Sequence, residues 1–232
     1  MNVKNKKKRI SISKILGLLC SIPKTIYFNL RAFPLAIALK LPVLVYYKVR
    51  IVEIHKNIIQ FPNGFHPLMV RIGYGGGRSI IGHNYSIINI RKGHVRFLGS
   101  ANFAEGTVLD NCGELTFGHH FSTNKNPFIS CSKEITFGDD VMFGYNVSVR
   151  DSDGHTVYFD GKPKTSQRPI IVGHHAWLAS HCHVLKGAVI PDDSIVAYGC
   201  VTSTKFSDKG ALIVGVPGKQ IQKGVSWGVF IQ

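Results

Sequence analysis

The stretch that decides the fold runs from Val172 to Val201 and reads VGHHAWLASHCHVLKGAVIPDDSIVAYGCV. An aliphatic residue returns at every sixth position of this stretch, and a small residue follows four places after each of them. A helix repeats its apolar residues at three and four, and a half-buried strand repeats them at two. A period of six therefore predicts short strands joined by corners, three of which make one coil of a parallel β-helix. The aliphatic positions are Val172, Leu178, Val184, Ile190 and Val196, and the small ones are Ala176, Cys182, Ala188, Ser194 and Cys200.

A looser form of the repeat precedes this stretch. The segments Val95–Phe97, Glu114–Gly118 and Glu134–Gly138 recur every twenty residues, which is three hexads plus two residues that we place at a corner. We therefore expect three looser coils over about residues 95–150 and about two tight coils over residues 172–204. A generic all-β sandwich is the alternative, but it would have to produce the fixed period by chance. Earlier segments that lack the period but could form irregular coils are Val49–Ile54, Met69–Ile72 and Ile87–Ile90.

The composition suits one β-rich domain in a reducing compartment. A chain of 232 residues is long enough to bury a substantial core, and its 24 glycines provide for many corners. Its five cysteines are odd in number and scattered, without a Cys-x-x-Cys pair or a dense disulfide framework. This usage indicates the cytoplasm. Cys182 and Cys200 occupy small-residue positions of the hexad, so we expect them to be core thiols.

The chain is strongly basic, with a formal net charge of +15, and part of this charge lies in the run Lys4–Arg9. Nucleic-acid binding is not expected, because neither an aromatic-basic RNA motif nor a helix-turn-helix is present. An anionic membrane face, an acidic glycan or a phosphorylated cofactor explains the charge equally well. So does the solvated surface of a basic protein.

Residues 10–47 are apolar, but basic residues and Pro23, Pro34 and Pro42 interrupt them. No stretch reaches the roughly 18 to 20 uncharged residues of a transmembrane helix. A signal peptide is also disfavoured, because Lys14 divides the apolar stretch and no small-x-small cleavage site follows. We expect one or two short amphipathic helices that lie on a bilayer surface or cap the exposed strand edge at the open end of the β-helix. Both roles can hold together.

The hexad array, the turn around Trp177 and the ending Gly215–Lys219 (GVPGK) carry a family resemblance. Over about residues 95–222 the chain resembles the hexapeptide-repeat acetyltransferases, especially the polysaccharide O-acetyltransferases of capsule and lipopolysaccharide clusters. The resemblance implies a left-handed parallel β-helix, a homotrimer with its active site between neighbouring prisms, and acetyl transfer from acetyl-CoA to a hydroxyl. Left-handed crossovers depart from the usual right-handed rule. The flat, very short strands of such a prism lack the twist that enforces that rule.

On this basis the fold class is all-β, a left-handed parallel β-helix preceded by a short, basic α-helical segment. Residues 1–48 form the basic, apolar N-terminal segment with its possible membrane-surface contact, and residues 49–222 form the acyltransferase domain. This domain contains a loop at residues 151–170, and residues 223–232 form a C-terminal tail.

His155 is the principal catalytic candidate. It ends the run Arg150–His155 (RDSDGH), where the hexad pattern stops and the long loop begins. A long excursion from a regular solenoid usually has a functional reason. Attack of a hydroxyl on a thioester needs a base that titrates near neutrality, and imidazole is such a base. The family's Gly-His pair falls on Gly154-His155 and implies that His155 is the general base. A plain surface-loop histidine is the alternative.

Two further polar residues are candidates near His155. Asp153 or Asp151 would orient the imidazole or stabilise the imidazolium, although either could instead cap the turn. Asn124 lies in Ser122–Asn126 (STNKN), which resembles a family segment whose first asparagine contacts the acceptor or the acetyl group. The coil count puts Asn124 one coil from the loop. A corner asparagine in a left-handed conformation is the alternative.

The resemblance also implies the contacts of acetyl-CoA. A backbone N–H at the position of Ser180 would bind the developing oxyanion, and Trp177 in the same turn would pack near the pantetheine. Ala197 and Gly199 would keep the wall low where the pantetheine passes. The complete set of expected cofactor contacts is Trp177, Ala179, Ser180, Ala197, Ser203, Lys205 and Lys219, the last of which would meet the CoA phosphates.

Two other functions compete with acetyl transfer. A zinc-dependent carbonic anhydrase uses the same fold, and here six histidines line the prism. We see no partner constellation for a metal, and hexad positions two and three point to solvent, so no metal is expected. The third possibility is a non-catalytic scaffold, which the intact His155 loop and the Gly-Val-Pro ending disfavour. The six histidines are His119, His120, His174, His175, His181 and His183.

The acceptor is not specified by the sequence. Sugar hydroxyls, amino-sugar amines and lipid-linked oligosaccharides share this chemistry. The basic, apolar N-terminus favours a lipid-linked saccharide acceptor and a cytoplasmic protein that is peripheral on the inner face of the cell membrane.

Overall fold

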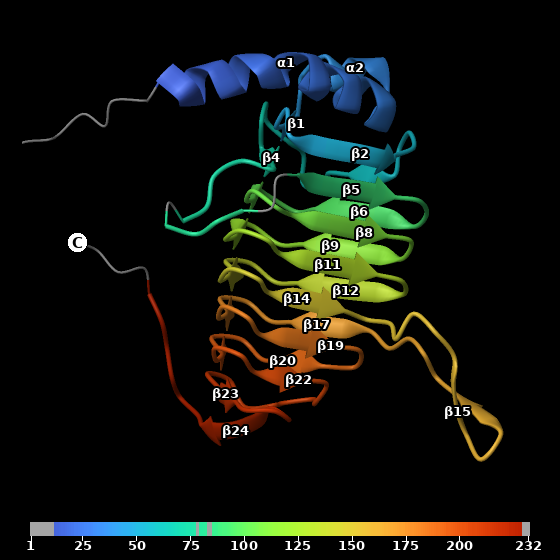
Figure 1. Ribbon diagram of the computed structural model, residues 1–232, viewed down its shortest axis with the longest axis vertical. Helices are drawn as coiled ribbons and strands as arrows, with labels where there is room; N and C mark the ends of the chain where they lie inside the picture. Colours follow the sequence, from blue (N-terminus) through green and yellow to red (C-terminus); the bar gives the residue numbers. More distant parts are fainter. Residues whose placement is uncertain (1–11, 78, 83–84, 229–232) are drawn as a thin grey trace, which may run out of the picture.

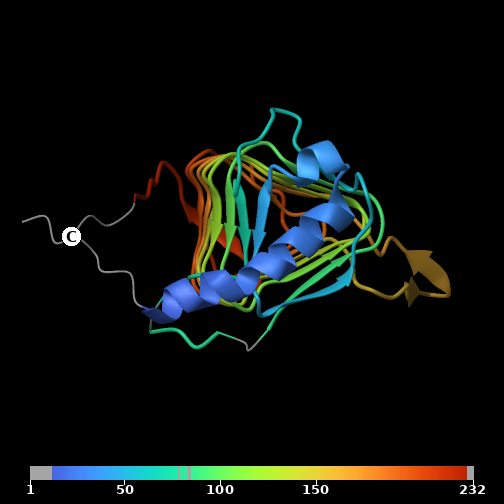
Figure 2. The ribbon, with the colours of Figure 1, turned by 90° about the horizontal axis from the view of Figure 1, so that it is seen from above.

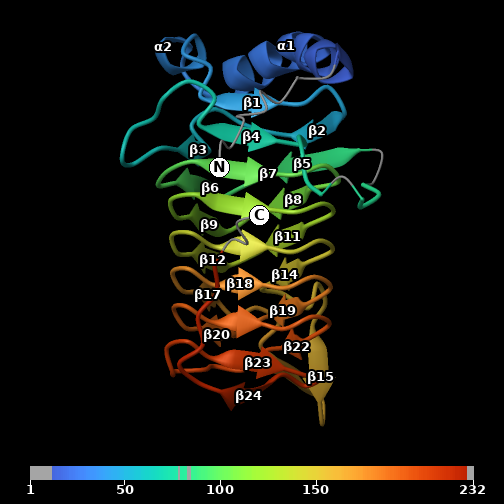
Figure 3. The ribbon, with the colours of Figure 1, turned by 90° about the vertical axis from the view of Figure 1, so that its left-hand side faces the viewer.

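The computed structural model describes residues 12–77, 79–82 and 85–228, which form a three-sided parallel β-helix covered at one end by helices (Figure 1). Each coil passes through three short strands, one on each side, and strands of successive coils pair in parallel. In Figure 3 the strands nearest the viewer run to the right as the chain descends, so the winding is left-handed. The expected fold class is confirmed.

The three sides are sheets A, B and C, in the order in which each coil visits them. Sheet A contains β1 (Val43–Val45), β4 (Val70–Ile72), β7 (Ala101–Phe103), β10 (Phe121–Thr123), β13 (Met142–Phe143), β18 (Trp177–Leu178), β21 (Ile195–Val196), β23 (Leu212–Val214) and β24 (Lys219–Gln222). Sheet B contains β2 (Val49–Glu53), β5 (Ser86–Ile90), β8 (Val108–Asn111), β11 (Phe128–Cys131), β14 (Ser148–Arg150), β19 (His183–Leu185) and β22 (Val201–Thr202). Sheet C contains β3 (Ile59–Gln60), β6 (His94–Phe97), β9 (Glu114–Phe117), β12 (Glu134–Phe137), β17 (Ile170–Val172) and β20 (Val189–Ile190).

The β-helix begins well before the twenty-residue repeat. β1 pairs with β4 and β2 pairs with β5, so the segments without a period are full coils. Their period is lost because the connections from β3 to β4 and from β4 to β5 are longer than the other corners. β1 lies within the range 1–48 that the sequence assigned to the N-terminal segment.

The ten hexad positions from Val172 to Cys200 are all buried. In the wider coils the same core column is filled by phenylalanines. Phe97, Phe117 and Phe137 stack in successive coils, with ring centroids 5.2 and 5.3 Å apart and nearly parallel planes. Burial raises the pKa of the Cys182 thiol to about 12, as expected for a core cysteine.

The two extra residues of each wide coil lie at the corner between sheets B and C. In a wide coil, the core residue Leu109 of sheet B is followed eight positions later by the core residue Phe117 of sheet C. In a tight coil, the equivalent residues Val184 and Ile190 are only six positions apart. The wider corner gives a larger cross-section, which the Phe rings fill. It also leaves backbone groups that inward polar side chains must satisfy.

Three rows of corners form the edges of the prism. The described residues of the A–B edge include 73–77, 79–82, 104–107, 124–127, 144–147, 179–182 and 197–200. Those of the B–C edge include 91–93, 112–113, 132–133, 151–169, 186–188 and 203–205. The C–A edge comprises residues 98–100, 118–120, 138–141, 173–176 and 191–194.

Helix α1 (Ile12–Ala32) and the short α2 (Leu35–Ala38) lie across the first coil (Figure 2). The sequence predicted short helices, whereas α1 has 21 residues and includes Pro23. The basic run Lys4–Arg9 lies outside the described residues. Within the described part, no helix is long and apolar enough to cross a bilayer.

α1 caps the free edge of sheet A through a polar stripe. Thr25 Oγ1 accepts from the Val45 N–H and donates to its carbonyl oxygen, both at 3.1 Å. Asn29 Nδ2 donates to the Val43 carbonyl oxygen at 2.7 Å. Ser21 Oγ, one turn earlier, accepts from the Tyr47 N–H at 2.9 Å. The first strand is thereby protected from pairing with another chain.

Candidate functional site

The predicted loop is an excursion from the B–C edge with a defined stem. Ser152 and Gln167 form an antiparallel bridge, and the Arg168 N–H donates to the Asp151 carbonyl oxygen at 3.0 Å. Beyond the stem, β15 (Val157–Phe159) and β16 (Lys162–Lys164) form a hairpin that projects from the prism (Figure 1). The excursion therefore has a fixed base and an exposed tip.

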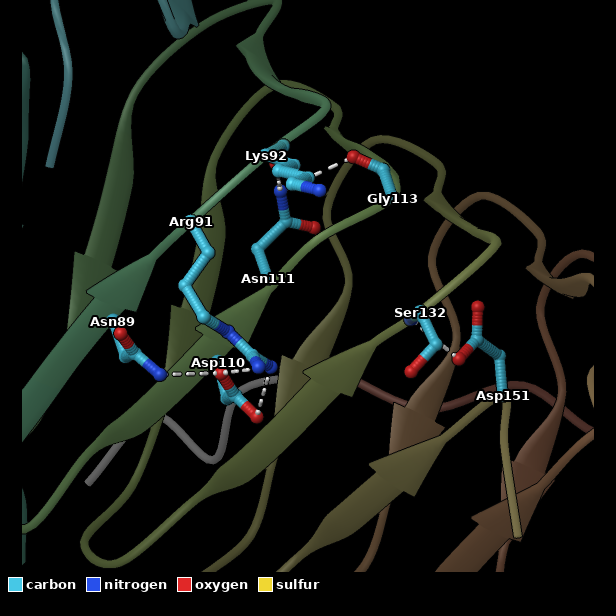
Figure 4. A network of polar contacts seen from close by, with 8 residues as sticks. All are labelled: Asn89, Arg91, Lys92, Asp110, Asn111, Gly113, Ser132 and Asp151. Carbon is cyan, nitrogen blue, oxygen red and sulfur yellow. Dashed lines mark hydrogen bonds and ion pairs between the residues drawn. The ribbon is translucent and has the colours of Figure 1, made fainter. Parts of the chain in front are cut away.

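Asp151 is a buried corner residue at the start of this excursion (Figure 4). Its Oδ1 accepts from the Ser132 N–H, and its Oδ2 accepts from the Lys133 and Glu134 N–H groups, all at 2.7 Å. Asn111 lies two coils earlier on the same edge and donates to the carbonyl oxygens of two neighbouring residues. Of the two roles predicted for Asp151, the structure shows the cap.

Asp153 makes an ion pair with Lys186 of the next coil. Lys186 Nζ also donates to the Thr165 carbonyl oxygen at 2.8 Å, so one ammonium group holds both arms of the excursion. The role of Lys186 was not predicted from the sequence. Its partners depend on the path of the excursion, which no periodic pattern encodes.

His155 follows the stem directly. Gly154 before it has a φ of +79°, a left-handed conformation that favours glycine. The imidazole of His155 is exposed, and within the described part of the chain no hydrogen bond or ion pair joins it to Asp153. The ring is therefore open to a substrate or to a neighbouring molecule.

Asn124 lies on the A–B edge, where it holds the glycine-rich part of the first extended corner. Its Oδ1 accepts from the Gly77 N–H at 2.8 Å and from the Lys125 N–H at 2.9 Å. Its amide NH₂ has no acceptor in the described part of the chain. Asn124 can therefore still donate two hydrogen bonds to a bound molecule. The contact with Gly77 was not predicted from the sequence.

Ser180 lies on the same edge, two sheet A strands further along the prism. Its Oγ accepts from the Tyr145 N–H at 3.2 Å, and its carbonyl oxygen accepts from the Gly199 N–H. Among the described residues, nothing accepts from the Ser180 N–H. A Cβ at Gly144 would approach the Ser180 nitrogen to 2.4 Å, so the corner is as tight as its backbone permits. An unpaired N–H at the surface is what an oxyanion site requires.

The A–B edge also carries aromatic side chains. His181 packs edge-on against Tyr145, with ring centroids 4.8 Å apart, and lies 5.1 Å from the ring of Tyr198. A hydrogen bond with Tyr145 raises the pKa of Tyr198, whose ring is exposed. Ala197, beside Tyr198, presents no more than a methyl group on this wall.

The predicted site residues therefore fall on two different edges of one chain. Asn124 precedes β11 and His155 follows β14, and these two strands are parallel neighbours in sheet B. The one-coil offset that the sequence predicted is correct, but the two residues lie at opposite ends of the sheet B strands. Within one chain, the length of a sheet B strand lies between them. A four-residue strand such as β11 spans four residues at a rise of about 3.3 Å each, and a corner adds to this at each end.

The remaining expected cofactor residues are also divided. Ser203 and Lys205 are exposed on the B–C edge, and Lys219 is exposed on β24. Trp177 lies on the outer face of sheet A, where the tail returns along the prism. There Trp227 lies 6.1 Å from Trp177 between ring centroids and stacks on His175 at 4.4 Å. The sequence analysis did not anticipate this tail contact.

The histidines lie on separate edges. His119, His120, His174 and His175 lie on the C–A edge, where His120 pairs with Asp140 and His175 pairs with Asp193. The hydrogen bond from His175 and that from Lys209 lower the pKa of Asp193. No group of three or more metal-ligating side chains gathers among the described residues.

Comparison with known proteins gives relatives of this chain in sequence and in fold. No family model matches the chain. Galactoside O-acetyltransferase of Escherichia coli (strain K12) is 29% identical over 129 residues, which is 54% of this chain and 63% of the relative. The polySia-specific acetyltransferase NeuO superposes over 78% of this chain and 77% of its own, with a TM-score of 0.57 and 19% identity. In sequence and in fold, the chain is similar to the hexapeptide-repeat acetyltransferases.

The match with the galactoside enzyme spans less than two thirds of that protein. The likeness to NeuO is one of fold, because the sequences are too different for more. An N-acyltransferase, AntD from Bacillus cereus, in complex with dTDP and 3-hydroxybutyryl-CoA, superposes over 88% of each chain with a TM-score of 0.46 and 13% identity.

Proposed function

We propose that the chain is an acetyl-CoA-dependent O-acetyltransferase that acetylates a hydroxyl group of a saccharide or saccharide precursor. The observation that carries this proposal is the chemical difference between two edges of the prism. On the A–B edge, the Ser180 N–H and the Asn124 amide are hydrogen-bond donors that have no acceptor among the residues that the structure describes. The B–C edge offers an exposed imidazole at His155. An acyl transfer needs both kinds of group.

In the proposed reaction His155 takes the proton of the acceptor hydroxyl while its oxygen attacks the thioester carbonyl carbon. The developing oxyanion accepts a hydrogen bond from the Ser180 N–H. When the C–S bond breaks, the imidazolium returns the proton to the CoA thiolate. Asn124 donates its free amide hydrogens to the acetyl carbonyl or to the acceptor. Asp153 supports His155 indirectly, since its carboxylate is paired with Lys186 at the stem.

The co-substrate is proposed to lie along the coils that follow Val172. Trp177, Ala179 and Ala197 would flank the pantetheine arm, and their small or flat side chains suit a narrow chain. Ser203, Lys205 and Lys219 are exposed where they could meet polar groups of CoA. The two lysines would contribute point charges for phosphate.

The site is proposed to be completed by a second copy of the chain in a homotrimer. In one chain His155 and Ser180 lie on different edges, which bound the two ends of sheet B. In a cyclic assembly, each copy can present its A–B edge to one neighbour and its B–C edge to the other. His155 of one copy would then face the hydrogen-bond donors at Ser180 and Asn124 of the next copy.

The acceptor is proposed to be a lipid-linked saccharide at the inner face of the cell membrane. Support comes from the basic, apolar N-terminal residues 1–48, which suit a location at that surface. A free saccharide that carries the same hydroxyl should also accept the acetyl group, although with a weaker apparent affinity.

The test is to incubate the full chain with acetyl-CoA and a panel of soluble saccharides. Release of the CoA thiol and the gain of one acetyl group by the acceptor are measured together. Transfer to a saccharide hydroxyl that depends on His155 is the expected result. Transfer only to amines would overturn the O-acetyl assignment. If acetyl-CoA neither binds nor turns over, the scaffold interpretation replaces the enzyme.

A further inference from the structure

α1 buries a mixed stripe, which includes the core residues Phe28 and Ala32, and exposes most of its other large apolar residues. Its polar residues Ser21, Thr25 and Asn29 are buried against β1, whereas an amphipathic helix on a globular core normally buries its apolar stripe. Seven large apolar residues of α1 are instead exposed, each over 42–55% of its surface. They are Ile15, Leu16, Leu19, Ile22, Ile26, Tyr27 and Leu30.

These residues form a continuous face that runs from one flank of α1 to the side that points away from the β-helix. At 100° per residue, Leu16, Leu19 and Leu30 lie opposite the stripe that contacts β1. The face continues beside α1 into an apolar recess of about 400 Å³, where it meets Leu41 and Leu68. Contiguous apolar surface of this kind marks a site that contacts another molecule or a membrane.

The charged residues in the sequence up to Val52 indicate the kind of partner. Residues 1–52 contain eleven Lys or Arg and no Asp or Glu, and the first acidic residue is Glu53. Arg31 is exposed at the end of α1, and Lys24 lies on its flank, where Nζ donates to the carbonyl oxygens of Tyr47 and Val49. An exposed apolar helix face, in a stretch of sequence whose charged residues are all basic, suits the interface of an anionic bilayer. It suits a second copy poorly, because that copy would carry the same charge.

We propose that α1 lies in the interface of an anionic membrane and that the β-helix stands upright on it. α1 runs across the end of the prism, perpendicular to the direction in which the coils stack (Figure 1). Its buried stripe is fixed to β1 by side-chain hydrogen bonds, so the helix cannot bind the bilayer without orienting the prism. This proposal goes beyond acetyl transfer and does not depend on it.

The upright orientation predicts how far the tryptophan side chains lie from the membrane interface. Trp177 lies five strands from β1 along sheet A, in the order β1-β4-β7-β10-β13-β18. At about 4.8 Å per strand this is roughly 24 Å from the first coil. The native tryptophans Trp177 and Trp227 should therefore stay in water when α1 is bound.

The first experiment measures co-sedimentation of the full chain with vesicles of phosphatidylcholine alone or mixed with phosphatidylglycerol. Binding is expected to the mixed vesicles and to weaken with salt. Leu19→Gln and Leu30→Gln should each lower the partition coefficient by about tenfold, because each removes one buried apolar side chain. Ile221→Gln, which changes an exposed apolar residue on β24 at the opposite end, is the matched control. Deletion of residues 1–9 should also weaken binding.

Unchanged binding of Leu19→Gln, or equal weakening by Ile221→Gln, would overturn the proposal. Circular dichroism melts of the variants should match wild type, because Leu19 and Leu30 are exposed and lie outside the hydrophobic core cluster of the described residues. Sedimentation without vesicles tests a second copy as the partner. If trimers or monomers associate further and Leu19→Gln abolishes this association, the apolar face of α1 is a self-association surface instead.

The second experiment tests the orientation with brominated lipids that quench tryptophan. Leu19→Trp should be quenched on binding, whereas the native Trp177 and Trp227 should not. Cys20 on α1 is exposed and offers a label-free check, since vesicles should protect it from a water-soluble maleimide. Cys112, a half-buried thiol on the B–C edge, should keep its reactivity. Strong quenching of the native tryptophans would show that the prism lies on its side and would contradict the upright arrangement.

Discussion

Lys186 and Asp153 form an ion pair that ties the excursion at residues 151–169 to the next coil of the β-helix. The same ammonium group donates to the Thr165 carbonyl oxygen, so both arms of the excursion are held at one point. Asp153 is two residues before His155, yet its carboxylate is directed at the lysine. The pair therefore fixes where the imidazole stands rather than contacting it.

His155→Ala should lower acetyl transfer by roughly 10²- to 10⁴-fold, the usual contribution of a general base. The affinity for acetyl-CoA should change little, because the proposed contacts of CoA lie on other residues. Steady-state kinetics and calorimetric titration with CoA check the two expectations. His120→Ala, which alters an exposed histidine on the C–A edge, is the control and should keep wild-type turnover. Full kcat in His155→Ala would remove the proposed base.

Lys186→Met should lower kcat by about tenfold, because misplacement of a catalytic group is costly even without its loss. Lys186→Arg should restore most of the rate, since it keeps a cation within reach of Asp153. A uniform loss of stability in both variants, with no recovery of kcat by arginine, would indicate a role in folding rather than in positioning His155.

Asp151→Asn should destabilise the protein by about 3 kcal/mol, because a buried carboxylate that accepts three backbone hydrogen bonds becomes an amide with one accepting oxygen. Urea unfolding followed by circular dichroism measures the change. The matched control is Asp160→Asn at the exposed hairpin tip, which should stay within about 0.5 kcal/mol of wild type. Equal midpoints for the two variants would contradict the capping role of Asp151.

Lys219→Ala should weaken CoA binding with a smaller effect on the chemical step, because a lysine at a phosphate acts through charge. Titration with CoA and with its dephosphorylated form separates the phosphate contribution. An unchanged Kd, or a loss confined to kcat, would remove Lys219 from the cofactor site.

The periodic part of the sequence predicted the fold well because each hexad position has one environment. Val184 represents the hexad position that lies in a strand, and Cys182 represents the one that lies at a corner. Each position is buried in every tight coil, so the residue type at that position repeats. The first coils could be predicted only as possible irregular coils, because the long connections from β3 to β4 and from β4 to β5 break the period without breaking strand pairing.

The candidate site was less accessible to sequence reasoning. A repeat gives the coil on which a residue lies, and this placed Asn124 one coil from the loop. The edge on which a residue lies depends on how many residues each corner contains. His155 and Asn124 could therefore be assigned to different edges only from the strand bounds of the structure. The pairing of Lys186 and the return of Trp227 onto His175 depend on loop and tail paths that leave no periodic signal.

The most direct test of the composite site is to mix two inactive variants. His155→Ala keeps its own Asn124 and Ser180, whereas Asn124→Ala keeps its own His155. If each site combines the A–B edge of one copy with the B–C edge of the next, random mixed trimers should regain about a quarter of wild-type activity. Co-expression of the two chains, followed by an acetyl-transfer assay, measures this recovery. No activity in the mixture above that of the separate variants would contradict a site shared between copies.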